Sequence, residues 1–453
     1  MTHQDGERAG LYRRILHGST LLDRPLRDLP AVDGAAATVQ CVLAPVLAEF
    51  VRWVLVSALH SGKKRLYFLA RDGYFMCRAA QLFCTAFSLP VECRYLSVSR
   101  HALRLPLLHT DHGWALDAVC RAGSSVTPEQ VLMRAGLTAQ ERQIALEQLH
   151  LPYPPDRPIP TAALPEIKRI LSQCAFFLQR MDIHSAAALP PLTGYLKQEG
   201  LAGGAADAVV DSGWVGSIQE AMMNACAIAG RTRPLDGYYF GLYSLPPRAA
   251  RSDYHCYYFA PEGDIRRKVY FSSSLFEAAF TAPHGTTTGY RKSDGSYAPV
   301  YAAVSDSSRA FSSGIAAQLT PYLERFAAVT DPADFLQEPF VENRTVLARL
   351  IRLFMGEPTR SEAEFFGGIP FSADSSAGED SPLAARLDGP QLRAWRPAAR
   401  LFSAADPLGE SAWYAGSAVL HGKNIRLNLA GYARYQYARH LRNTYLYRKE
   451  RNL

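Results

Sequence analysis

The apolar residues of the first hundred positions fall into blocks whose length and spacing change along the chain. Residues 38 to 60 (TVQCVLAPVLAEFVRWVLVSALH) are apolar on all sides at helical spacing, which predicts a mostly buried helix. After a polar turn, the short aromatic-rich run from Leu66 to Ala70 predicts a buried parallel strand. A second helix is expected over residues 74 to 87 and a second strand over residues 92 to 98. This order of elements predicts an α/β fold.

The alternation of strand and helix resumes after a long helical stretch. An apolar run at residues 208 to 210 predicts a third strand, which leads into the polar segment from Asp211 to Ser217 (DSGWVGS). Helical spacing returns over residues 218 to 229, and the run from 237 to 242 (GYYFGL) predicts a further strand. The third strand therefore ends, like the first, at an acidic residue with a glycine close behind it.

At 453 residues the chain is longer than one hydrophobic core usually supports. We expect an N-terminal extension (residues 1 to 34), an α/β core (residues 35 to 110 and 191 to 300), a helical insertion (residues 111 to 190) and a mainly helical C-terminal region (residues 301 to 453).

The composition is that of a folded globular protein, with 48% hydrophobic and 20% charged residues. The net charge of +7 is mild for this length, and lysine and arginine are scattered except near the C-terminus. A nucleic-acid partner is not expected, because such proteins gather basic charge on one face. The eight cysteines fall singly and without zinc-site spacing, which favours free thiols in a reducing compartment.

The N-terminal residues (MTHQDGERAGLYRR) lack the apolar segment of a signal peptide. The longest apolar run, from Val42 to Leu59, contains Pro45, Glu49 and Arg52, so we do not expect it to span a membrane. The expected location is the cytoplasm.

Two acidic residues, Asp72 and Asp211, stand where a predicted strand stops and a helix is about to begin. Ligands of parallel α/β sheets bind beyond the carboxyl ends of the strands, and the glycines after these aspartates let the backbone approach an anion. A pair of carboxylates at this place suits Mg²⁺ beside a phosphate, since the ion needs only one or two of them. The alternative is that each aspartate only caps a helix or shapes a turn.

Arg71 and Arg100 follow the first two strands. A guanidinium presents a fork of donors that matches phosphate or carboxylate. We expect these arginines to bind an anionic small molecule such as a sugar phosphate or a nucleotide sugar, unless each forms an internal salt bridge with Asp72 or Asp211.

Further candidates for the same site are Ser212, Trp214, Gln219 and His284. Trp214 and Gln219 suit a stacking wall and a hydrogen-bonding arm for a sugar, while a packed indole and a surface amide are equally open interpretations. His284 lies in the turn Ala-Pro-His-Gly and suits a general acid or base near neutral pH, although loop histidines are more often structural.

These motifs resemble those of the haloacid-dehalogenase-like (HAD-like) superfamily. YFLARDGYFM (residues 67 to 76) resembles its first motif, a strand that runs into D-x-D-G, and residues 209 to 230 resemble its fourth. The resemblance implies a HAD-like Rossmannoid parallel sheet flanked by helices, with the insertion acting as a helical cap. It also implies that Ser97 or Ser99 holds the phosphoryl group and that Lys197 is the nearest candidate for the third-motif lysine.

A closer resemblance is to a branch of predicted HAD-like hydrolases encoded among bacterial surface-polysaccharide genes. It covers roughly residues 35 to 420 and rests on these segments: FLARDGY (68 to 74), YLSVSR (95 to 100), DSGWVGSIQ (211 to 219), APHGTTTGY (282 to 290) and SAWYAGS (411 to 417).

The chain departs from the superfamily pattern at the nucleophile. If Asp72 and Gly73 match the second aspartate of the first motif and its glycine, then Ala70 occupies the position of the attacking aspartate. A methyl group cannot form an aspartyl-phosphate. Either the chain does no such chemistry, or Asp72 takes over with Tyr74 at the acid/base position, where a phenol of pKa ~10 is a poor catalyst.

Residues 432 to 453 predict a basic helix rich in tyrosine. Such a helix can pack its tyrosines on the parent domain, lie as a peripheral contact at an anionic inner-membrane surface, or contact RNA. Packing on the domain is the preferred interpretation.

Two classes of function compete. The first is a Mg²⁺-dependent phosphohydrolase or phosphotransferase that acts on a phosphorylated sugar or nucleotide-sugar precursor of a surface polysaccharide. The second is a catalytically inactive HAD-like binding or scaffold protein for glycan assembly, with a glycosyltransferase as partner. A third hypothesis is a sugar-transferring enzyme that uses the same crevice.

Overall fold

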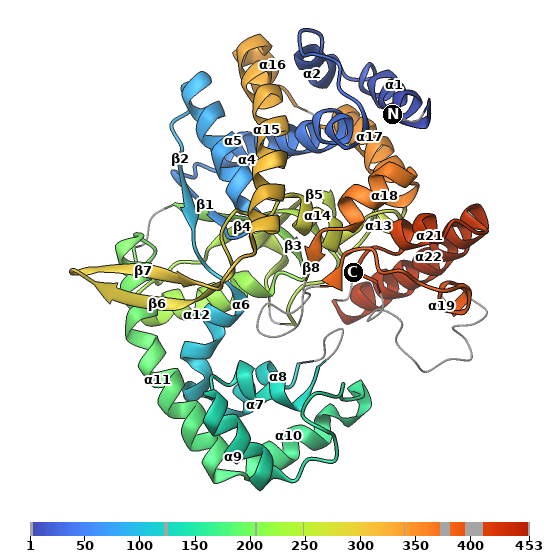
Figure 1. Cartoon of the computed structure of the whole chain (residues 1–453). Coiled ribbons are helices and arrows are strands. Elements are labelled where there is room, and N and C mark those ends of the chain that lie inside the picture. The colour runs from blue at the N-terminus through green and yellow to red at the C-terminus, as the bar shows by residue number, and fades with distance from the viewer. Residues whose placement is uncertain are drawn as a thin grey trace.

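The core of the molecule is a parallel β-sheet of five strands in the order β2-β1-β3-β4-β5 (Figure 1). A computed structural model describes residues 3 to 451 except 122–125, 204–205, 248, 339, 372–380 and 395–410. The strands of the sheet are β1 (Arg65–Leu69), β2 (Glu92–Leu96), β3 (Asp207–Trp214), β4 (Asp236–Leu242) and β5 (Tyr254–Phe259). The expected α/β class with a parallel sheet is therefore confirmed.

Strand β1 lies between the edge strand β2 and the central strand β3, where the order in which the chain adds strands changes direction. Its partner on one side is β2, with Phe68 opposite Tyr95, and its partner on the other side is β3, with Phe68 opposite Val210. The chain thus adds β2 on one side of β1 and later adds β3, β4 and β5 on the other side. In open parallel sheets a crevice for ligands lies at this topological switch point, beyond the carboxyl ends of the two strands.

Side chains along the strands alternate between two separate cores. Leu66, Phe68 and Val210 belong to a large apolar cluster on one face of the sheet. Tyr67 and Val209, which alternate with these residues along the strands, belong to a second cluster on the other face. This period of two is what a strand buried on both faces requires.

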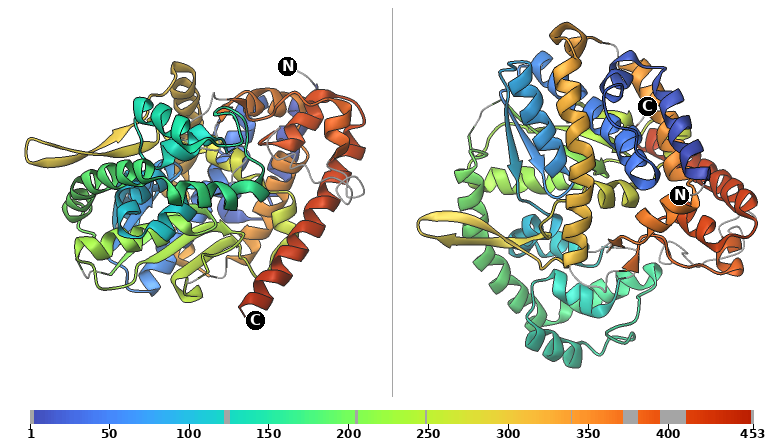
Figure 2. Two further views of the ribbon diagram at one scale, coloured as in Figure 1. Left: turned by 90° about the horizontal axis from the view of Figure 1, so that it is seen from below. Right: turned by 45° about the horizontal axis from the view of Figure 1, so that its top comes forward.

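Helices cover both faces of the sheet (Figures 1 and 2). The first face is covered by α4 (Ala44–His60), α5 (Gly73–Ala86) and α15 (Asp306–Val329), which pack against one another. The second is covered by α11 (Ala175–Gln198) and α12 (Ser217–Ala229). Because α15 lies in the C-terminal third of the chain, that region shares the core of the sheet.

The helix predicted over residues 38 to 60 is present as a continuous helical stretch from Gly34 to His60. By length and composition it is the one helix among the described residues that is able to cross a membrane. In the fold, 89% of its apolar window is buried, and its residues form much of the first core.

The insertion between β2 and β3 forms a helical unit with a core of its own. Leu116, Leu132, Ile167 and Phe177 are buried together there. Figure 1 shows the unit below the sheet, joined to it through the long helix α11. Its remaining helices are α7 (His112–Val119), α8 (Pro128–Arg134), α9 (Ala139–Leu149) and α10 (Leu164–Gln173).

Helix α8 begins where the sequence signals a start. The Thr127 hydroxyl accepts from the backbone N–H of Gln130, and the Gln130 side chain accepts from the backbone N–H of Thr127. This capping box satisfies donors that a helix start leaves without partners.

The C-terminal helix α22 (Ile425–Glu450) docks on the β5 side of the sheet. Tyr447 is buried with residues of β4 and β5, and the guanidinium of Arg451 donates to the carbonyls of Ala249 and Pro246, at 2.7 Å each. Its other side leaves Tyr437 and Tyr445 exposed. The packed arrangement expected for this helix is therefore the one observed.

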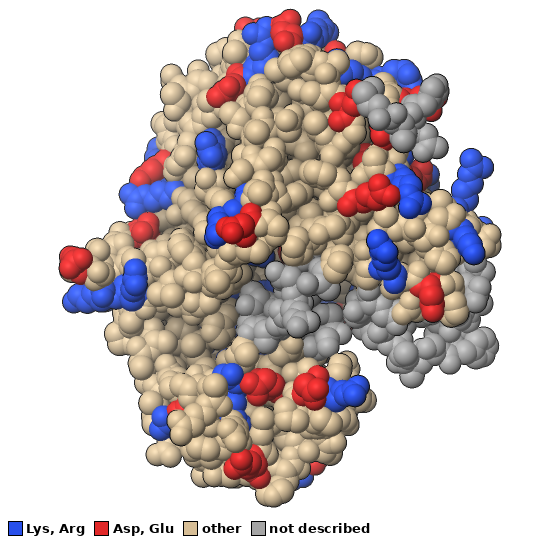
Figure 3. All heavy atoms as spheres, viewed as in Figure 1, with Lys and Arg blue, Asp and Glu red and all other residues tan. Residues whose placement is uncertain are grey.

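The remaining described helices and strands are α1 (His3–Leu16), α2 (Thr20–Asp23), α3 (Gly34–Thr38), α6 (Arg100–Arg104), α13 (Ile265–Val269), α14 (Ser273–Ala279), the hairpin β6 (Thr287–Ser293) and β7 (Ser296–Tyr301), α16 (Pro332–Leu336), α17 (Val341–Ile351), α18 (Arg360–Gly367), β8 (Pro370–Phe371), β9 (Ser381–Pro382), α19 (Gly389–Ala394) and α21 (Tyr414–His421). Acidic and basic side chains are interspersed over the face of the molecule in Figure 3.

Helix α4 contains a buried salt bridge, and its removal tests how strongly burial affects the stability of the protein. Arg52 is 2% exposed and forms a two-pronged salt bridge with the fully buried Glu49, at 2.7 and 2.8 Å, while it also donates to the carbonyls of Phe335 and Gln337. We predict that Arg52→Ala lowers the free energy of unfolding by about 3–5 kcal/mol in chemical denaturation, because an unpaired carboxylate stays buried.

A matched control is the Glu166–Arg169 pair, which has the same spacing and the same two-pronged geometry in α10 but is exposed. Arg169→Ala should leave the unfolding midpoint unchanged within error. Equal effects of the two substitutions would contradict the importance given to burial.

Candidate functional site

The ends of β1 and β3 meet through Asp72 and Ser212. Asp72 follows β1 at the start of α5, and the hydroxyl of Ser212, in β3, donates a short hydrogen bond to its Oδ2 atom. Gly73 permits this turn, because a Cβ atom there would lie 2.9 Å from the carbonyl carbon of Phe68. The structure therefore brings the end of the first strand against the end of the third.

Asp211 and Glu277 lie beside Asp72 and repel it electrostatically. Burial raises the pKa of the Asp211 carboxyl well above its usual range, and the neighbouring Asp72 and Glu277 raise it further. Burial and Asp72 together raise the pKa of Glu277 to about 7. Burial also raises the pKa of Asp72, although the hydrogen bond from Ser212 opposes this. Three carboxyl groups from three elements thus form one cluster in which negative charge is costly.

Trp214 connects this cluster to the aromatic core. Its indole Nε1 donates a short hydrogen bond to Oε1 of Glu277, and its rings pack against Phe271 and Phe276, with centroids 5.2 and 5.8 Å away. The residue has a φ of +80°, a left-handed conformation that is rare for a large side chain. Gly213 precedes it at φ +114°. Strained backbone of this kind clusters at functional sites.

Cationic and neutral donors surround the carboxyl cluster. The positive charges of Arg71 and Arg100 lower the pKa values of Asp72 and Glu277, which places both guanidinium groups within electrostatic reach. Neither forms a salt bridge with a described carboxylate at 4.0 Å or less, so the internal pairing considered for them is not observed. They remain available for an anion.

His284 lies at the edge of the same region. Its Nε2 atom shares a 2.8 Å hydrogen bond with the hydroxyl of Tyr95, and its Nδ1 lies 2.8 Å from the carbonyl of Gly285. Burial lowers the pKa of its imidazole, and the charge of Arg71 lowers it further. Asp72 in turn helps to raise the pKa of Tyr95. A neutral imidazole is thereby connected to the cluster through a tyrosine.

Two residues expected at the site lie elsewhere. Lys197 is exposed on the last turn of α11. Just after this turn, the carbonyl of Glu199 accepts a hydrogen bond from the hydroxyl of Tyr67. Gly200, the next residue, lies against Arg65 at the start of β1. That is the amino end of the strand, opposite to the carboxylates. The structure therefore does not bring Lys197 to the carboxylates.

Gln219 is buried and entirely engaged in the fold. Its amide donates to the carbonyls of Leu235 and Asp253 and accepts from the hydroxyl of Tyr239, which ties α12 to the beginnings of β4 and β5. Every polar group of the side chain has a partner, so Gln219 is a structural residue and not an arm for a ligand.

Ser97 and Ser99 also have internal partners. The Ser97 hydroxyl lies 2.6 Å from the hydroxyl of Tyr301, and the Ser99 hydroxyl donates to the carbonyl of Thr287 and accepts from the backbone N–H of Ala102 as the cap of α6. Each hydroxyl has a protein partner in this arrangement, and the role of Ser97 or Ser99 in holding a phosphoryl group stays a prediction.

The donor set was tested for a metal ion. Among the described residues, no group of three or more His, Cys, Asp or Glu side chains is placed to hold one. Asp72 and Asp211 provide two carboxylates, which matches Mg²⁺, an ion that keeps several waters. Burial raises the pKa values of both carboxyls, and for Asp211 the charges of Asp72 and Glu277 add to it; a bound cation would oppose these effects.

The sequence offers Glu277 as an acid/base candidate comparable to His284, but it does not predict that Glu277 lies beside Asp72. Glu277 lies in α14, 63 residues after the tryptophan to which it is bonded, and no motif relates the two. The available signal was a lone glutamate inside the apolar run SSLFEAAF, since a glutamate among buried residues is rarely without a partner.

Fold and site together define an α/β protein with a carboxylate cluster at the switch point of a parallel sheet. No protein-family model matches the chain, and no curated protein sequence matches it.

The carboxylate cluster predicts an unusual pH dependence of stability. Glu277 has its pKa raised from the usual 4.5 to about 7 in the folded state, so the folded protein binds more protons than the unfolded chain between these values. The free energy of unfolding should therefore fall as the pH rises from about 4.5 to about 7. Glu277→Gln should flatten this part of the profile in urea titrations at several pH values.

The control is Glu147→Gln, which changes an exposed glutamate of α9. Its profile should follow that of the unmodified protein. Stability that rises over the same interval, and is insensitive to Glu277→Gln, would show that the glutamate is ionised in the folded state.

Proposed function

We propose that the chain is a HAD-like hydrolase of the phosphatase or phosphotransferase type, acting on a phosphorylated sugar or nucleotide-sugar precursor of a surface polysaccharide. The observation that supports this most is the meeting of Asp72, Asp211 and Glu277 at the carboxyl ends of β1 and β3, beside two arginines without salt bridges. The quoted resemblance of motifs supplies the superfamily.

In this proposal Asp72 and Asp211 hold Mg²⁺, and Arg71 and Arg100 orient the phosphoryl group. The ion would supply charge neutralisation at the phosphoryl oxygens. The arginines contribute donors that match a phosphate's geometry. In the hydrolytic reaction a water molecule attacks phosphorus as the bond to the departing oxygen breaks, and Glu277, with a pKa of about 7, is suited to give that oxygen a proton, since an acid near the working pH transfers protons best.

The helical unit of residues 111 to 190 takes the role of a cap in the same proposal. It is inserted between β2 and β3, next to the switch point, and has its own core. A cap of this kind excludes water from a reacting phosphate. A cytoplasmic location, with the exposed Tyr437 and Tyr445 side of α22 at an anionic membrane surface, fits a role in envelope synthesis and belongs to the proposal.

The alternative is an inactive HAD-like protein that binds a precursor or a glycosyltransferase during glycan assembly. Ala70 favours it, because this methyl group occupies the nucleophile position of the resembled motif. The backbone N–H of Ala70 donates to the carbonyl of Leu96 at 3.0 Å, which holds the residue in line with β1. A sugar-transferring enzyme would use the same pocket and hydrolyse or transfer an activated donor.

Catalysis is tested with a panel of sugar phosphates and nucleotide sugars in the presence of Mg²⁺. We predict that the unmodified protein turns over at least one member and that Asp72→Asn and Asp211→Asn each reduce kcat at least about a hundredfold, as loss of a charged active-site group does. Asp253→Asn, at the amino end of β5, is the control and should keep full activity.

Complete inactivity of the unmodified protein, together with retained binding of the same compounds, would favour the scaffold function. Turnover that both active-site substitutions leave intact would place the chemistry elsewhere in the molecule.

Metal binding is tested independently of turnover by thermal unfolding. At pH 7.5, Mg²⁺ should raise the Tm of the unmodified protein, because binding to the folded state alone stabilises it. Asp211→Asn should abolish this shift. An equal shift in both proteins would mean that the ion binds somewhere other than the carboxylate cluster.

A further inference from the structure

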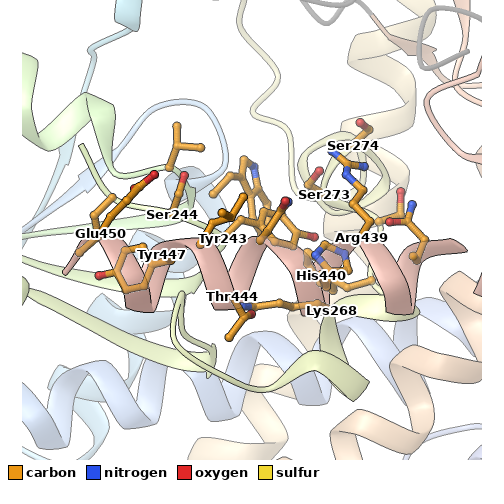
Figure 4. Close-up of a pocket in the computed structure, with 18 of the residues that line it drawn as sticks. Tyr243, Ser244, Lys268, Ser273, Ser274, Arg439, His440, Thr444, Tyr447 and Glu450 are labelled. Atoms are coloured by element: carbon orange, nitrogen blue, oxygen red, sulfur yellow. The ribbon is translucent and has the colours of Figure 1, made fainter. Parts of the chain in front are cut away.

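A large cavity lies between helix α22 and the loops that follow β3 and β4. Its volume is about 950 Å³, and it is closed on one side by Trp214, the residue whose indole is bonded to Glu277. Figure 4 shows side chains from α22, from the loop after β4 and from the region around α14 facing one another across it. The cavity therefore begins where the carboxylate cluster ends.

Three cationic residues, Lys268, Arg439 and Arg451, line this cavity together with the carboxylate of Glu450. Lys268 is 2% exposed, and the carbonyl of Pro261, at 3.2 Å, is its one hydrogen-bond acceptor among the described residues. Arg439 is half-buried and forms no hydrogen bond or ion pair with a described residue. Buried ammonium and guanidinium groups are costly unless an anion pairs with them.

The neighbouring aromatic rings form a rigid wall. Tyr243 stacks on His440, with centroids 5.3 Å apart and an interplanar angle of 8°. Burial lowers the pKa of His440 to about 3, so its imidazole is neutral and does not add to the charge of the cavity. Both Trp214 and Tyr243 are partly exposed on the cavity side of this cluster. Flat rings beside hydrogen-bonding groups are typical of sites for sugars and nucleosides.

We propose that this cavity is a second binding site, for an organic phosphate that carries a hydroxylated ring, with Lys268 and Arg439 on the phosphate and the ring beside Trp214 and Tyr243. Sugar phosphates and nucleoside diphosphates share this chemistry. The volume lies at the upper end of the range for small-molecule sites, which leaves room for either. The proposal of this second site does not depend on whether the carboxylate cluster catalyses a reaction.

The test is isothermal titration calorimetry without Mg²⁺, using uridine diphosphate, glucose 1-phosphate and inorganic phosphate as separate probes. We expect one of the two organic probes to bind more tightly than inorganic phosphate, and the tighter one identifies the source of the ring. Absence of binding by all three probes overturns the proposal, as does equal binding of all three.

Arg439→Gln locates the bound phosphate. It should weaken binding of the tighter probe about tenfold, the usual cost of one charge-assisted hydrogen bond. The matched control is Arg442→Gln, which changes an exposed arginine on the same helix that does not line the cavity, and it should leave the affinity unchanged. Equal effects of the two substitutions would show nonspecific attraction to a basic helix.

Asp72→Asn should bind the probe normally, so failure of the second site and failure of the proposed hydrolase are distinguishable.

Discussion

Pairing of β1 with β3 is the constraint on which the rest of the structure depends. Because Phe68 lies opposite Val210, the residues that follow these positions are carried to the same edge of the sheet, and Asp72 and Asp211 become neighbours. Two neighbouring carboxyl groups that are buried away from water resist ionisation, because each negative charge disfavours the other. Burial and the charge of Asp72 raise the pKa of Glu277 to about 7, and the nearby guanidinium groups partly offset this. Arg71 and Arg100 form no salt bridge with a described carboxylate, although both lie within electrostatic reach of Asp72 and Glu277.

Much of the fold could be predicted from apolar periodicity. The buried helix before β1, the strands themselves and the helical insertion follow from runs whose spacing differs between strand and helix. One boundary was misplaced: β3 continues through Asp211 to Trp214, beyond the predicted end at residue 210. The polar letters DSGW suggested a loop, but Gly213 and Trp214 still pair with Gly241 and Leu242 of the neighbouring strand. Backbone pairing therefore outweighs local composition there.

The site was only partly predictable, for a physical reason that differs between residues. Asp72 is recognisable because it follows the end of β1, and Asp211 because it lies in β3 one position beyond the pair of Phe68 and Val210. Lys197 and Gln219 lie on helices, where a shift of one residue in the predicted position turns the side chain to another face of the helix. Whether such a side chain is free also depends on its tertiary partners, which the sequence does not show. Glu277 belongs to no motif, and only the folded chain shows that it meets the indole of Trp214.

The central claim is that these carboxylates form one pocket for a metal ion and an oxyanion. The most direct measurement is a crystal structure of the protein with Mg²⁺ and orthovanadate. The account predicts the ion between the carboxylates of Asp72 and Asp211, and the vanadate beside it within hydrogen-bonding distance of Arg71 and Arg100. Carboxylates on separate sides of the molecule, or both ligands bound away from the ends of β1 and β3, would contradict it.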